Sequence, residues 1–393
     1  MPSVCFYFQM HQPFRLRRYS IFDTEPTYFD EAGNAEILKK VAERSYEPGT
    51  KLLLEMIERH EGRFRISFSV TGVLIEQLRA HAPKVIENLQ ALAETGCVEF
   101  LNETYHHSLA FLYSRGEFRE QVDRHAELME EMFGQKPTVF RNTELIYNND
   151  LAEYLEGMGR FKGVLTEGAD ALLEGRSPDV TYRPPGCEGL TLLLRNYRLS
   201  DDIAFRFSNR SWPHWPMTAA KFADWVGELE GPVCNLFMDF ETFGEHQWAD
   251  TGIFAFLAEV PSALLRRAGN DFKTVGEAID AYEPADTFDV PQMISWADTE
   301  RDLSAWLGNA MQSNALHEIY KLEATIKQTG DAALLQSWRR LSISDHFYYM
   351  CTKYFSDGDV HKYFNPYQSP YDSYINFMNV LDNLRSRVLI PQK

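Results

Sequence analysis

The sequence predicts an α/β protein built from parallel βαβ units and followed by a C-terminal bundle of helices. Two observations predict this fold. About seven short β-rich runs alternate with helix-patterned segments over the first 285 of the 393 residues, and the pattern then becomes all-helical. Hydrophobic residues make up 44% of the chain and charged residues 24%, which is enough apolar surface for a sizeable core.

The predicted strands are short runs rich in β-branched and aromatic residues. In chain order they cover 5–8, 66–70, 98–101, 138–141, 163–166, 190–194 and 233–238. The segments between them carry apolar residues at helical spacing, as in 35–59 and 118–133. Because each strand is followed by a helix, we expect the strands to lie parallel in one sheet or barrel.

Three helices are predicted after residue 285. They cover about 303–327, about 332–354, and the segment that begins after Pro370. The connection at 286–294 is too apolar and too short for a flexible linker, so we expect the helices to pack on the preceding domain. The expected domains are therefore 1–285 and 286–393.

Charge and cysteine usage exclude several classes of partner. The formal net charge of −18 argues against binding to nucleic acid or to an anionic membrane, because both require cationic side chains. The five cysteines are far apart and lack metal-binding spacing, which indicates buried thiols in a reducing compartment. No signal peptide or long apolar run is present, so a cytoplasmic protein is expected.

Polar residues gather just after the predicted strands, where the carboxyl ends of parallel strands would place them on one rim. They include His11, Glu103, His107, Glu144, Asp239, Glu241 and His246. Glu144 and Asp239 stand out because each closely follows an apolar run. Two carboxylates on one rim are the minimum equipment for hydrolysis of a glycosidic bond. The alternative interpretation is that each acid caps a helix.

The histidines leave two interpretations open. His11 could be a hydrogen-bonded core residue, and His106 and His107 would point to opposite faces of an extended segment. A metal site would require His11, one of that pair, and Asp239 or His246 to converge. We expect no metal and no cofactor.

Aromatic residues reach 13% of the chain, with 27 Phe, 19 Tyr and 7 Trp. Trp212 and Trp215 lie in a proline-punctuated segment, and Trp296 and Trp306 lie at the start of the helical region. Flat rings with a polar edge suit the faces of pyranose sugars. The alternative is ordinary core packing, which is the more natural interpretation for Trp225 and Trp338.

Five segments, taken in order, resemble glycoside hydrolase family 57. They are HQP at 11–13, SVTGVLIE at 69–76, RNTELIY at 141–147, MDFETFGEH at 238–246, and SWAD at 295–298 with DLSAWLGN at 302–309. The resemblance implies an incomplete (β/α)7 barrel as the catalytic domain over 1–285. It also implies that the helical bundle over 286–393 contributes to the substrate cleft.

The same resemblance implies roles for individual residues. Glu144 would be the nucleophile of a retaining reaction and Asp239 the acid/base, with their carboxyl groups roughly 5 to 5.5 Å apart. Sugar hydroxyls would be held by His11, Glu76, Glu241, His246 and Asp302, and stacking would come from Trp296 and Trp306. Glu103 and His107 fit a role in the site although they lie outside the five segments.

The sequence thus predicts a retaining hydrolase of α-1,4-glucans of the α-amylase type, whose partner is an α-glucan oligo- or polysaccharide. A 4-α-glucanotransferase using the same residues is the main alternative. A non-catalytic glucan-binding relative and a metal-dependent hydrolase, such as a deacetylase or an α-mannosidase, are the others. Many family members carry further domains, so the length of this chain argues against branching activity.

Overall fold

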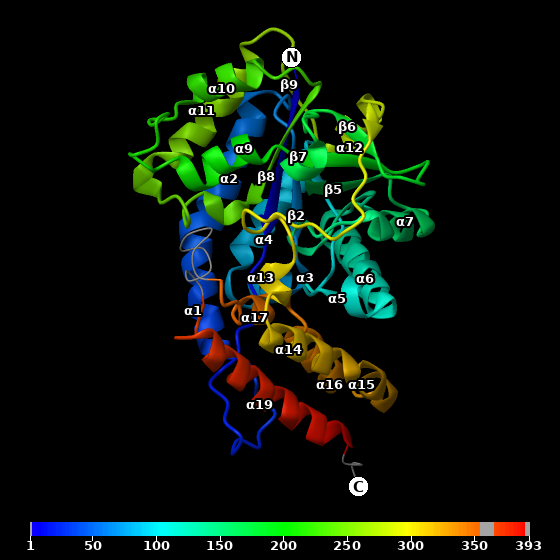
Figure 1. Cartoon of the computed structure of the whole chain (residues 1–393). Helices are drawn as coiled ribbons and strands as arrows, with labels where there is room; N and C mark the ends of the chain where they lie inside the picture. The colour runs from blue at the N-terminus through cyan, green and yellow to red at the C-terminus, as the bar shows by residue number, and fades with distance from the viewer. Residues whose placement is uncertain (1, 354–364, 390–393) are drawn as a thin grey trace.

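Seven parallel strands form the centre of the computed structural model, which describes residues 2–353 and 365–389 (Figure 1). They coincide with the seven predicted runs to within one or two residues. They are β1 Ser3–Met10, β2 Ile66–Val70, β3 Val98–Phe100, β4 Val139–Arg141, β5 Gly163–Glu167, β7 Thr191–Arg195 and β8 Val233–Asp239.

The strands lie in two sheets that meet along both edges. One sheet has the order β3-β2-β1-β8 and the other contains β7-β5-β4. A parallel bridge between Asn102 and Phe140 joins β3 to β4. On the other side the backbone N–H of Asn196 donates to the carbonyl oxygen of Asn235 at 2.9 Å, which joins β7 to β8. The seven strands therefore close a barrel, and the predicted α/β fold is confirmed.

Three further strands were not predicted. β6 Thr181–Arg183 runs antiparallel to β7, β10 Asp286–Thr287 pairs with β6, and β9 Asp271–Phe272 pairs with the first residues of β1. Each contains only two or three residues, which is too short for an alternating pattern to be recognised.

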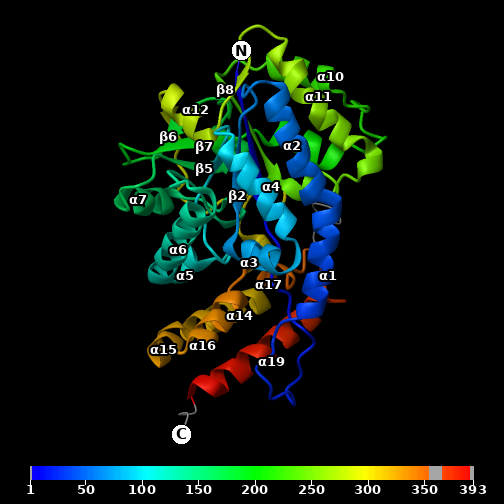
Figure 2. The same cartoon turned by 180° about the vertical axis from the view of Figure 1, so that it is seen from behind.

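Helices cover the outside of the barrel, and Figure 2 shows α1, α2 and α4 from behind. The predicted helix at 35–59 is α1 and α2 joined by a π-helical turn at Ala42–Tyr46, and the one at 118–133 is α6. The helices are α1 Glu31–Val41, α2 Glu47–Arg59, α3 Gly72–His81, α4 Pro83–Glu94, α5 Ala110–Tyr113, α6 Arg115–Phe133, α7 Asn149–Gly157, α8 Asp170–Leu173, α9 Tyr197–Asp201, α10 Ala219–Gly227, α11 Ile253–Leu265 and α12 Val275–Ala281.

The inside of the barrel changes from apolar to charged toward the carboxyl ends of the strands. An apolar layer is formed by Tyr7, Leu101, Val139, Leu165, Leu193 and Phe237. Two residues farther along, on the same face of each strand, stand Gln9, Glu103, Arg141, Glu167, Arg195 and Asp239. A layer of mostly charged side chains therefore forms the floor beneath whatever binds at this end.

The C-terminal helices lie beyond that end of the barrel (Figure 1). They are α13 Ser304–Leu307, α14 Ala310–Lys321, α15 Glu323–Thr329, α16 Ala332–Leu341, α17 Ser344–Tyr348 and α19 Pro370–Leu389. The single helix expected at 303–327 is broken, because Asn309 caps a new helix together with Gln312. The second expected helix is divided into α16 and α17, and its last residue, Tyr354, lies outside the described residues.

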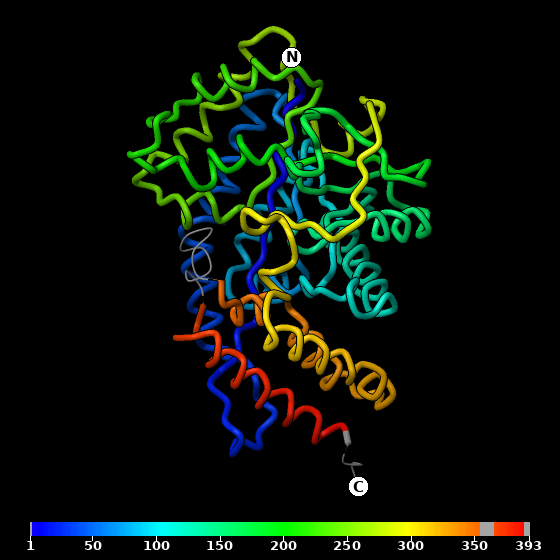
Figure 3. Tube along the Cα trace, in the orientation of Figure 1, coloured from blue at the N-terminus to red at the C-terminus, as the bar shows by residue number. Residues whose placement is uncertain are grey.

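Two connections tie the bundle to the barrel. The segment between β10 and α13 passes in front of the barrel in Figure 3. The loop after β1 packs on α19, where the backbone N–H of Tyr19 donates to Asn376 and the hydroxyl of Tyr28 to Asn383, both at 2.7 Å. Among the described residues, no helix has both the length and the apolar character needed to cross a membrane.

Candidate active site

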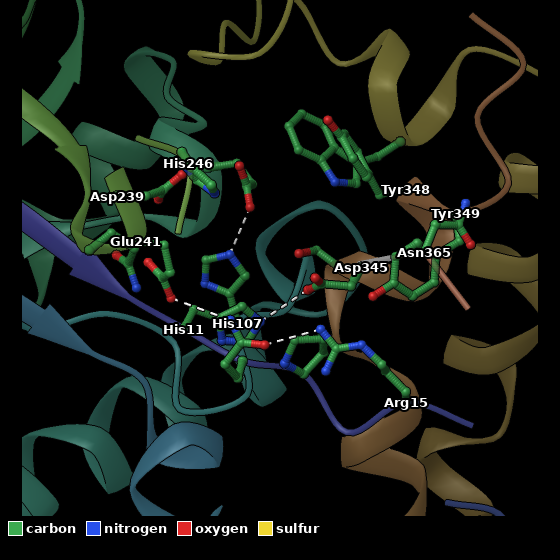
Figure 4. Close-up of a pocket in the computed structure, with 16 residues that line it drawn as sticks. His11, Arg15, His107, Asp239, Glu241, His246, Asp345, Tyr348, Tyr349 and Asn365 are labelled. Atoms are coloured by element: carbon green, nitrogen blue, oxygen red, sulfur yellow. Dashed lines mark hydrogen bonds and ion pairs between the residues drawn. The ribbon is translucent and has the colours of Figure 1, made fainter. Parts of the chain in front are cut away.

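A cavity lies between the carboxyl ends of the strands and helices α13 and α17 (Figure 4). The barrel contributes both candidate catalytic carboxyl groups, Glu144 and Asp239, and the bundle contributes Asp345. The lining residues are Gln9, His11, Gln12, Pro13, Arg15, His107, Glu144, Asp239, Glu241, His246, Trp306, Ser344, Asp345, Tyr348, Tyr349 and Asn365.

Glu144 lies in a tight turn directly after β4. The turn is a 3-10 segment at Thr143–Leu145 in which Glu144 and Leu145 have φ angles of 58° and 52°, a conformation that is rare for residues other than glycine. Both carboxylate oxygens are engaged: Oε1 lies 2.8 Å from His107 Nε2, and Oε2 accepts the indole N–H of Trp296 at 2.7 Å. The turn and these two bonds fix the carboxylate at the cavity wall.

The pKa values of the two candidate catalytic carboxyl groups are shifted in opposite directions. Burial alone would raise the pKa of Glu144, but the hydrogen bond and positive charge of His107 outweigh it and lower the pKa. At the end of β8, burial and the negative charge of Glu144 raise the pKa of Asp239 to about 7. Near neutral pH the site therefore pairs an ionised carboxylate with a carboxyl group that carries a proton for much of the time.

His107 is the cation in contact with Glu144. Its ring lies between Glu103 and Glu144, with Nδ1 3.4 Å from Glu103 Oε2 and Nε2 2.8 Å from Glu144 Oε1. Burial favours the neutral ring, but the hydrogen bonds to these two carboxylates raise the pKa of His107 to about 9. Glu103 is fully buried and contacts two residues that line the cavity, His107 and Gln9.

His11 links the barrel to the bundle. Its Nδ1 lies 2.9 Å from the hydroxyl of Thr71, and its Nε2 lies 3.0 Å from Asp345 Oδ2 on α17. Burial and the positive charge of His107 lower the pKa of His11, so the ring is neutral at pH 7 and donates to Asp345. All four ring nitrogens of His11 and His107 thus have protein partners, and among residues 2–353 and 365–389 no cluster of three side chains is suited to hold a metal ion.

Glu241 and His246 line the cavity on the side away from Tyr348 and Tyr349 (Figure 4). Burial and the neighbouring charge of Asp239 raise the pKa of Glu241 to about 8, and its Oε1 accepts the hydroxyl of Tyr46. Burial lowers the pKa of His246 to about 4. Both side chains are therefore largely neutral at pH 7 and can exchange hydrogen bonds with a neutral ligand.

The two predicted stacking tryptophans are in different situations. Trp306 on α13 is fully buried and forms part of the cavity lining, next to the ring of Tyr348 at 5.8 Å. Trp296 contacts Glu144 through its N–H, and its ring lies 4.8 Å from the guanidinium of Arg141 and 5.8 Å from that of Arg195. Trp296 thus holds a carboxylate, which the sequence did not predict.

Arg141 is unusual among the buried charges of the barrel. It is fully buried at the end of β4, and none of its guanidinium nitrogens has a hydrogen-bond partner. The nearest carboxylate oxygen, Glu103 Oε2, is 4.0 Å away. Its positive charge helps to lower the pKa of Glu144 and limits the rise in the pKa of Asp239.

Four predicted site residues do not line the cavity. Glu103 and Trp296 contact the lining residues His107 and Glu144, whereas the other two, Glu76 and Asp302, have partners elsewhere. Glu76 lies in an ion cluster, where its carboxylate accepts hydrogen bonds from Tyr105, Arg124 and Arg340 at 3.0, 3.4 and 3.0 Å. Asp302 is exposed and accepts the backbone N–H of Ser304 at 2.8 Å, at the start of α13. The structure thus gives both carboxylates protein partners outside the cavity.

Several residues in and around the cavity were missed by sequence reasoning. Gln12 lies inside the HQP segment and Arg141 opens the RNTELIY segment, so both had a detectable signal. The residues on and beside α17 had none, because an amphipathic pattern does not tell which polar side chain faces another domain. They are Ser344, Asp345, Tyr348 and Tyr349.

Comparisons with known proteins identify the family of the chain. The model of glycosyl hydrolase family 57 matches residues 5–291. A protein named "Putative alpha-amylase" from Methanocaldococcus jannaschii is 41% identical over 96% of this chain and 83% of its own.

Solved structures show the same fold at low identity. A GH57-type branching enzyme from Pyrococcus horikoshii has a TM-score of 0.70 and 15% identity over 97% of this chain and 88% of its own. The α-amylase AmyC from Thermotoga maritima has a TM-score of 0.65 and 14% identity over 99% and 94%. A 4-α-glucanotransferase from Thermococcus litoralis has a TM-score of 0.68 and 15% identity over 88% of this chain, which spans 56% of that enzyme.

The fold is therefore the (β/α)7 barrel with a C-terminal helical bundle that these enzymes share. Because the family model covers most of the chain and a relative matches it almost end to end, the chain belongs to glycosyl hydrolase family 57 and is a glycoside hydrolase.

Proposed function

We propose that this protein is a retaining hydrolase of α-1,4-glucans of the α-amylase type, with Glu144 as nucleophile and Asp239 as acid/base. One observation carries the proposal: two neighbouring carboxyl groups in one cavity have pKa values shifted in opposite directions. A retaining glycosidase requires this difference, because one group must attack as an anion while the other delivers a proton.

In the first step, Glu144 attacks the anomeric carbon and forms a covalent glycosyl ester. The bond to the leaving oxygen breaks, and Asp239 gives its proton to that oxygen. His107 and Trp296, which donate to the two oxygens of Glu144, orient the carboxylate for attack. The positive charge of His107 also keeps Glu144 ionised before the sugar binds.

In the second step, Asp239 removes a proton from water, which attacks the anomeric carbon and releases Glu144. The site supplies a reason for this change of role. The negative charge of Glu144 is one cause of the raised pKa of Asp239, and this charge is absent once Glu144 is esterified. The pKa of Asp239 then falls, so that the group which acted as an acid becomes a base.

The substrate assignment rests on the relatives and on the lining of the cavity. The relatives include proteins named as an α-amylase and a 4-α-glucanotransferase. The largely neutral groups at Glu241 and His246, together with the rings of Trp306 and Tyr348, suit an uncharged sugar. We also propose that the bundle, residues 286–393, contributes to the substrate cleft, because Asp345 and Trp306 line the cavity.

The test is a time course with maltoheptaose, read by product length and by ¹H NMR of the first anomer released. We expect shorter oligosaccharides that appear first as the α-anomer, with new reducing ends. Glu144→Gln and Asp239→Asn should each lower kcat by more than about 100-fold. Glu87→Gln, an exposed acid on α4, is the matched control and should retain wild-type activity.

Other outcomes would replace the proposal. Products longer than seven units with few new reducing ends would identify a 4-α-glucanotransferase that uses the same residues. Initial release of the β-anomer would exclude retention. Wild-type turnover in both Glu144→Gln and Asp239→Asn would show that other residues catalyse the reaction. Loss of activity in a chelator, restored by zinc, would identify a metal-dependent hydrolase. We also propose that the protein is cytoplasmic, and cell fractionation would test this location.

A further inference from the structure

The large exposed hydrophobic side chains of the described residues fall into two groups. Ile21, Phe22, Tyr371 and Ile375 belong to the loop after β1 and to α19, which pack on each other. Phe205 belongs to the π-helical turn Asp202–Arg206 after α9, Trp215 to the loop that follows this turn, and Trp248 to the loop after β8. Isolated exposed hydrophobic residues are common, but grouped aromatic rings indicate a binding surface.

Trp248 lies next to the cavity. It follows the cavity-lining His246 by two residues, so the two Cα atoms are at most about 7 Å apart. A turn, in which the N–H of Gly244 donates to the carbonyl oxygen of Gln247 at 2.9 Å, fixes this segment. Within three residues the chain passes from a side chain in the cavity, through buried Gln247, to an indole that is 54% exposed.

Gln247 also holds Phe205 near Trp248. Its side-chain amide donates to the carbonyl oxygen of Ala204 at 2.8 Å, and both Gln247 and Ala204 are buried. The residues that follow this buried pair, Phe205 and Trp248, are 52% and 54% exposed. One internal hydrogen bond therefore brings two half-exposed aromatic rings onto neighbouring segments.

Trp215 belongs to a segment that approaches the loop after Trp248. It is 43% exposed, and two residues later Met217 lines a hollow together with Gly252. Gly252 closes the short 3-10 turn that begins after Trp248. In contrast, Trp212, which the sequence also singled out, packs against the core and the ring of Trp225 at 5.9 Å.

We propose that Phe205 and Trp248 form an outer binding strip for an α-glucan chain that extends out of the cavity, with Trp215 at its far end. Pyranose rings present faces of C–H groups that stack on aromatic rings, and the strip is continuous with the cavity through His246. This inference rests on the proposed function and adds to it that productive binding depends on chain length.

The experiment compares kcat/KM on maltotriose, which is too short to fill both the cavity and the strip, with kcat/KM on amylose. Trp248→Ala and Phe205→Ala should each lower kcat/KM on amylose by about 2- to 10-fold, mainly through KM. The double variant should lower it further. On maltotriose all three variants should stay within about twofold of wild type.

Matched controls come from the second group of exposed rings. Phe22→Ala and Tyr371→Ala remove aromatic rings that are 87% and 62% exposed, and both should leave the amylose kinetics unchanged. Trp248→Phe keeps a ring and should retain most of the wild-type KM. Thermal melts of every variant identify those that are misfolded, and Trp248→Gln replaces any alanine variant that fails to fold.

A binding measurement separates this inference from the proposed function. Electrophoretic retardation in a gel containing amylose is measured in a Glu144→Gln background, with and without the strip substitutions. Retardation that is lost only with the strip substitutions supports the strip. If wild-type enzyme cleaves amylose but the double strip variant matches Phe22→Ala in both assays, the strip is overturned. If wild-type enzyme cleaves no α-glucan, the proposed function itself fails.

Discussion

The imidazole rings of His11 and His107 are stacked, with their centres 4.0 Å apart and their planes 21° apart. His107 is protonated between two carboxylates, and its charge helps to keep His11 neutral. Two histidines in contact thus have different charges at the same pH. This difference allows His11 to donate one N–H to Asp345 while His107 donates both of its own.

Replacing His107 should weaken the nucleophile. In His107→Gln the charge-assisted hydrogen bond to Glu144 is lost, and since such bonds contribute about 1.5–3 kcal/mol, kcat/KM should fall roughly 10- to 100-fold. The pKa of Glu144 should rise, so the acidic limb of the pH profile should move to higher pH. His317→Gln, an exposed histidine on α14, is the control. An unchanged acidic limb in His107→Gln would contradict the assigned role of His107.

The pH profile of the wild-type enzyme should be bell-shaped. Asp239 must be protonated to donate, and its pKa is raised to about 7, so kcat/KM should decline as the pH rises above about 7. Glu144 must be ionised to attack, and its pKa is lowered, so the acidic limb should lie below the ordinary value for a carboxyl group. Steady-state kinetics between pH 3 and 9 at constant ionic strength, a range of about six units, would show both limbs.

The negative charge of Glu144 can also be removed by substitution, without formation of the glycosyl ester. In Glu144→Gln the pKa of Asp239 should fall, because one of the causes that raise it is gone. Carbon-13 NMR or difference infrared titration of the Asp239 carboxyl group would measure the change. A pKa of Asp239 that is equal or higher in Glu144→Gln would contradict the explanation for its change of role between the two steps.

Arg141 should act as a positioning residue. Its buried charge helps to lower the pKa of Glu144 and limits the rise in the pKa of Asp239, and its guanidinium lies over the ring of the Trp296 that holds Glu144. Arg141→Met should therefore shift both limbs of the pH profile to higher pH and lower kcat more than it raises KM. Arg141→Lys should restore part of the profile. A loss of stability with an unshifted profile would assign Arg141 a structural role only.

Glu76 should contribute to stability and not to sugar binding. In Glu76→Gln the carboxylate charge that pairs with Arg124 and Arg340 is lost, which should cost about 1 kcal/mol and lower Tm by roughly 1–3 °C. KM for maltoheptaose should not change. Differential scanning fluorimetry and the maltoheptaose assay are the measurements. A raised KM with unchanged Tm would restore the role that the sequence predicted for Glu76.

The strands of the barrel could be predicted from sequence because each is a short apolar run with a polar residue at its end. In the structure, Glu103, Arg141 and Asp239 each lie two residues beyond an apolar residue of the barrel interior, as the alternation of side chains along a strand requires. What could not be predicted is which side chains contact each other. Glu76 lies within α3, six residues after the end of β2, and there it meets Arg340 of α16 instead of the cavity.

The bundle shows the same limit. Its apolar stripes predicted that helices pack, whereas the break at Asn309 depended on a local cap that competes with the stripe. Nothing in the segment around Asp345 distinguishes a solvent-facing acid from one that reaches His11, 334 residues earlier. Long-range pairing of this kind is a property of the folded chain and is not encoded in a local pattern.

The contacts between the loop after β1 and α19 have a consequence for folding. Tyr28 and Asn383 are 355 residues apart, and His11 meets its partner only when α17 is in place. Contacts of such high sequence separation form late, since closing long loops costs entropy before the contacts compensate for it. A chain emerging from the ribosome can therefore assemble its barrel early, but it completes its cavity only after the last helices have been synthesised. The first strand in sequence is thus among the last parts of the site to become functional.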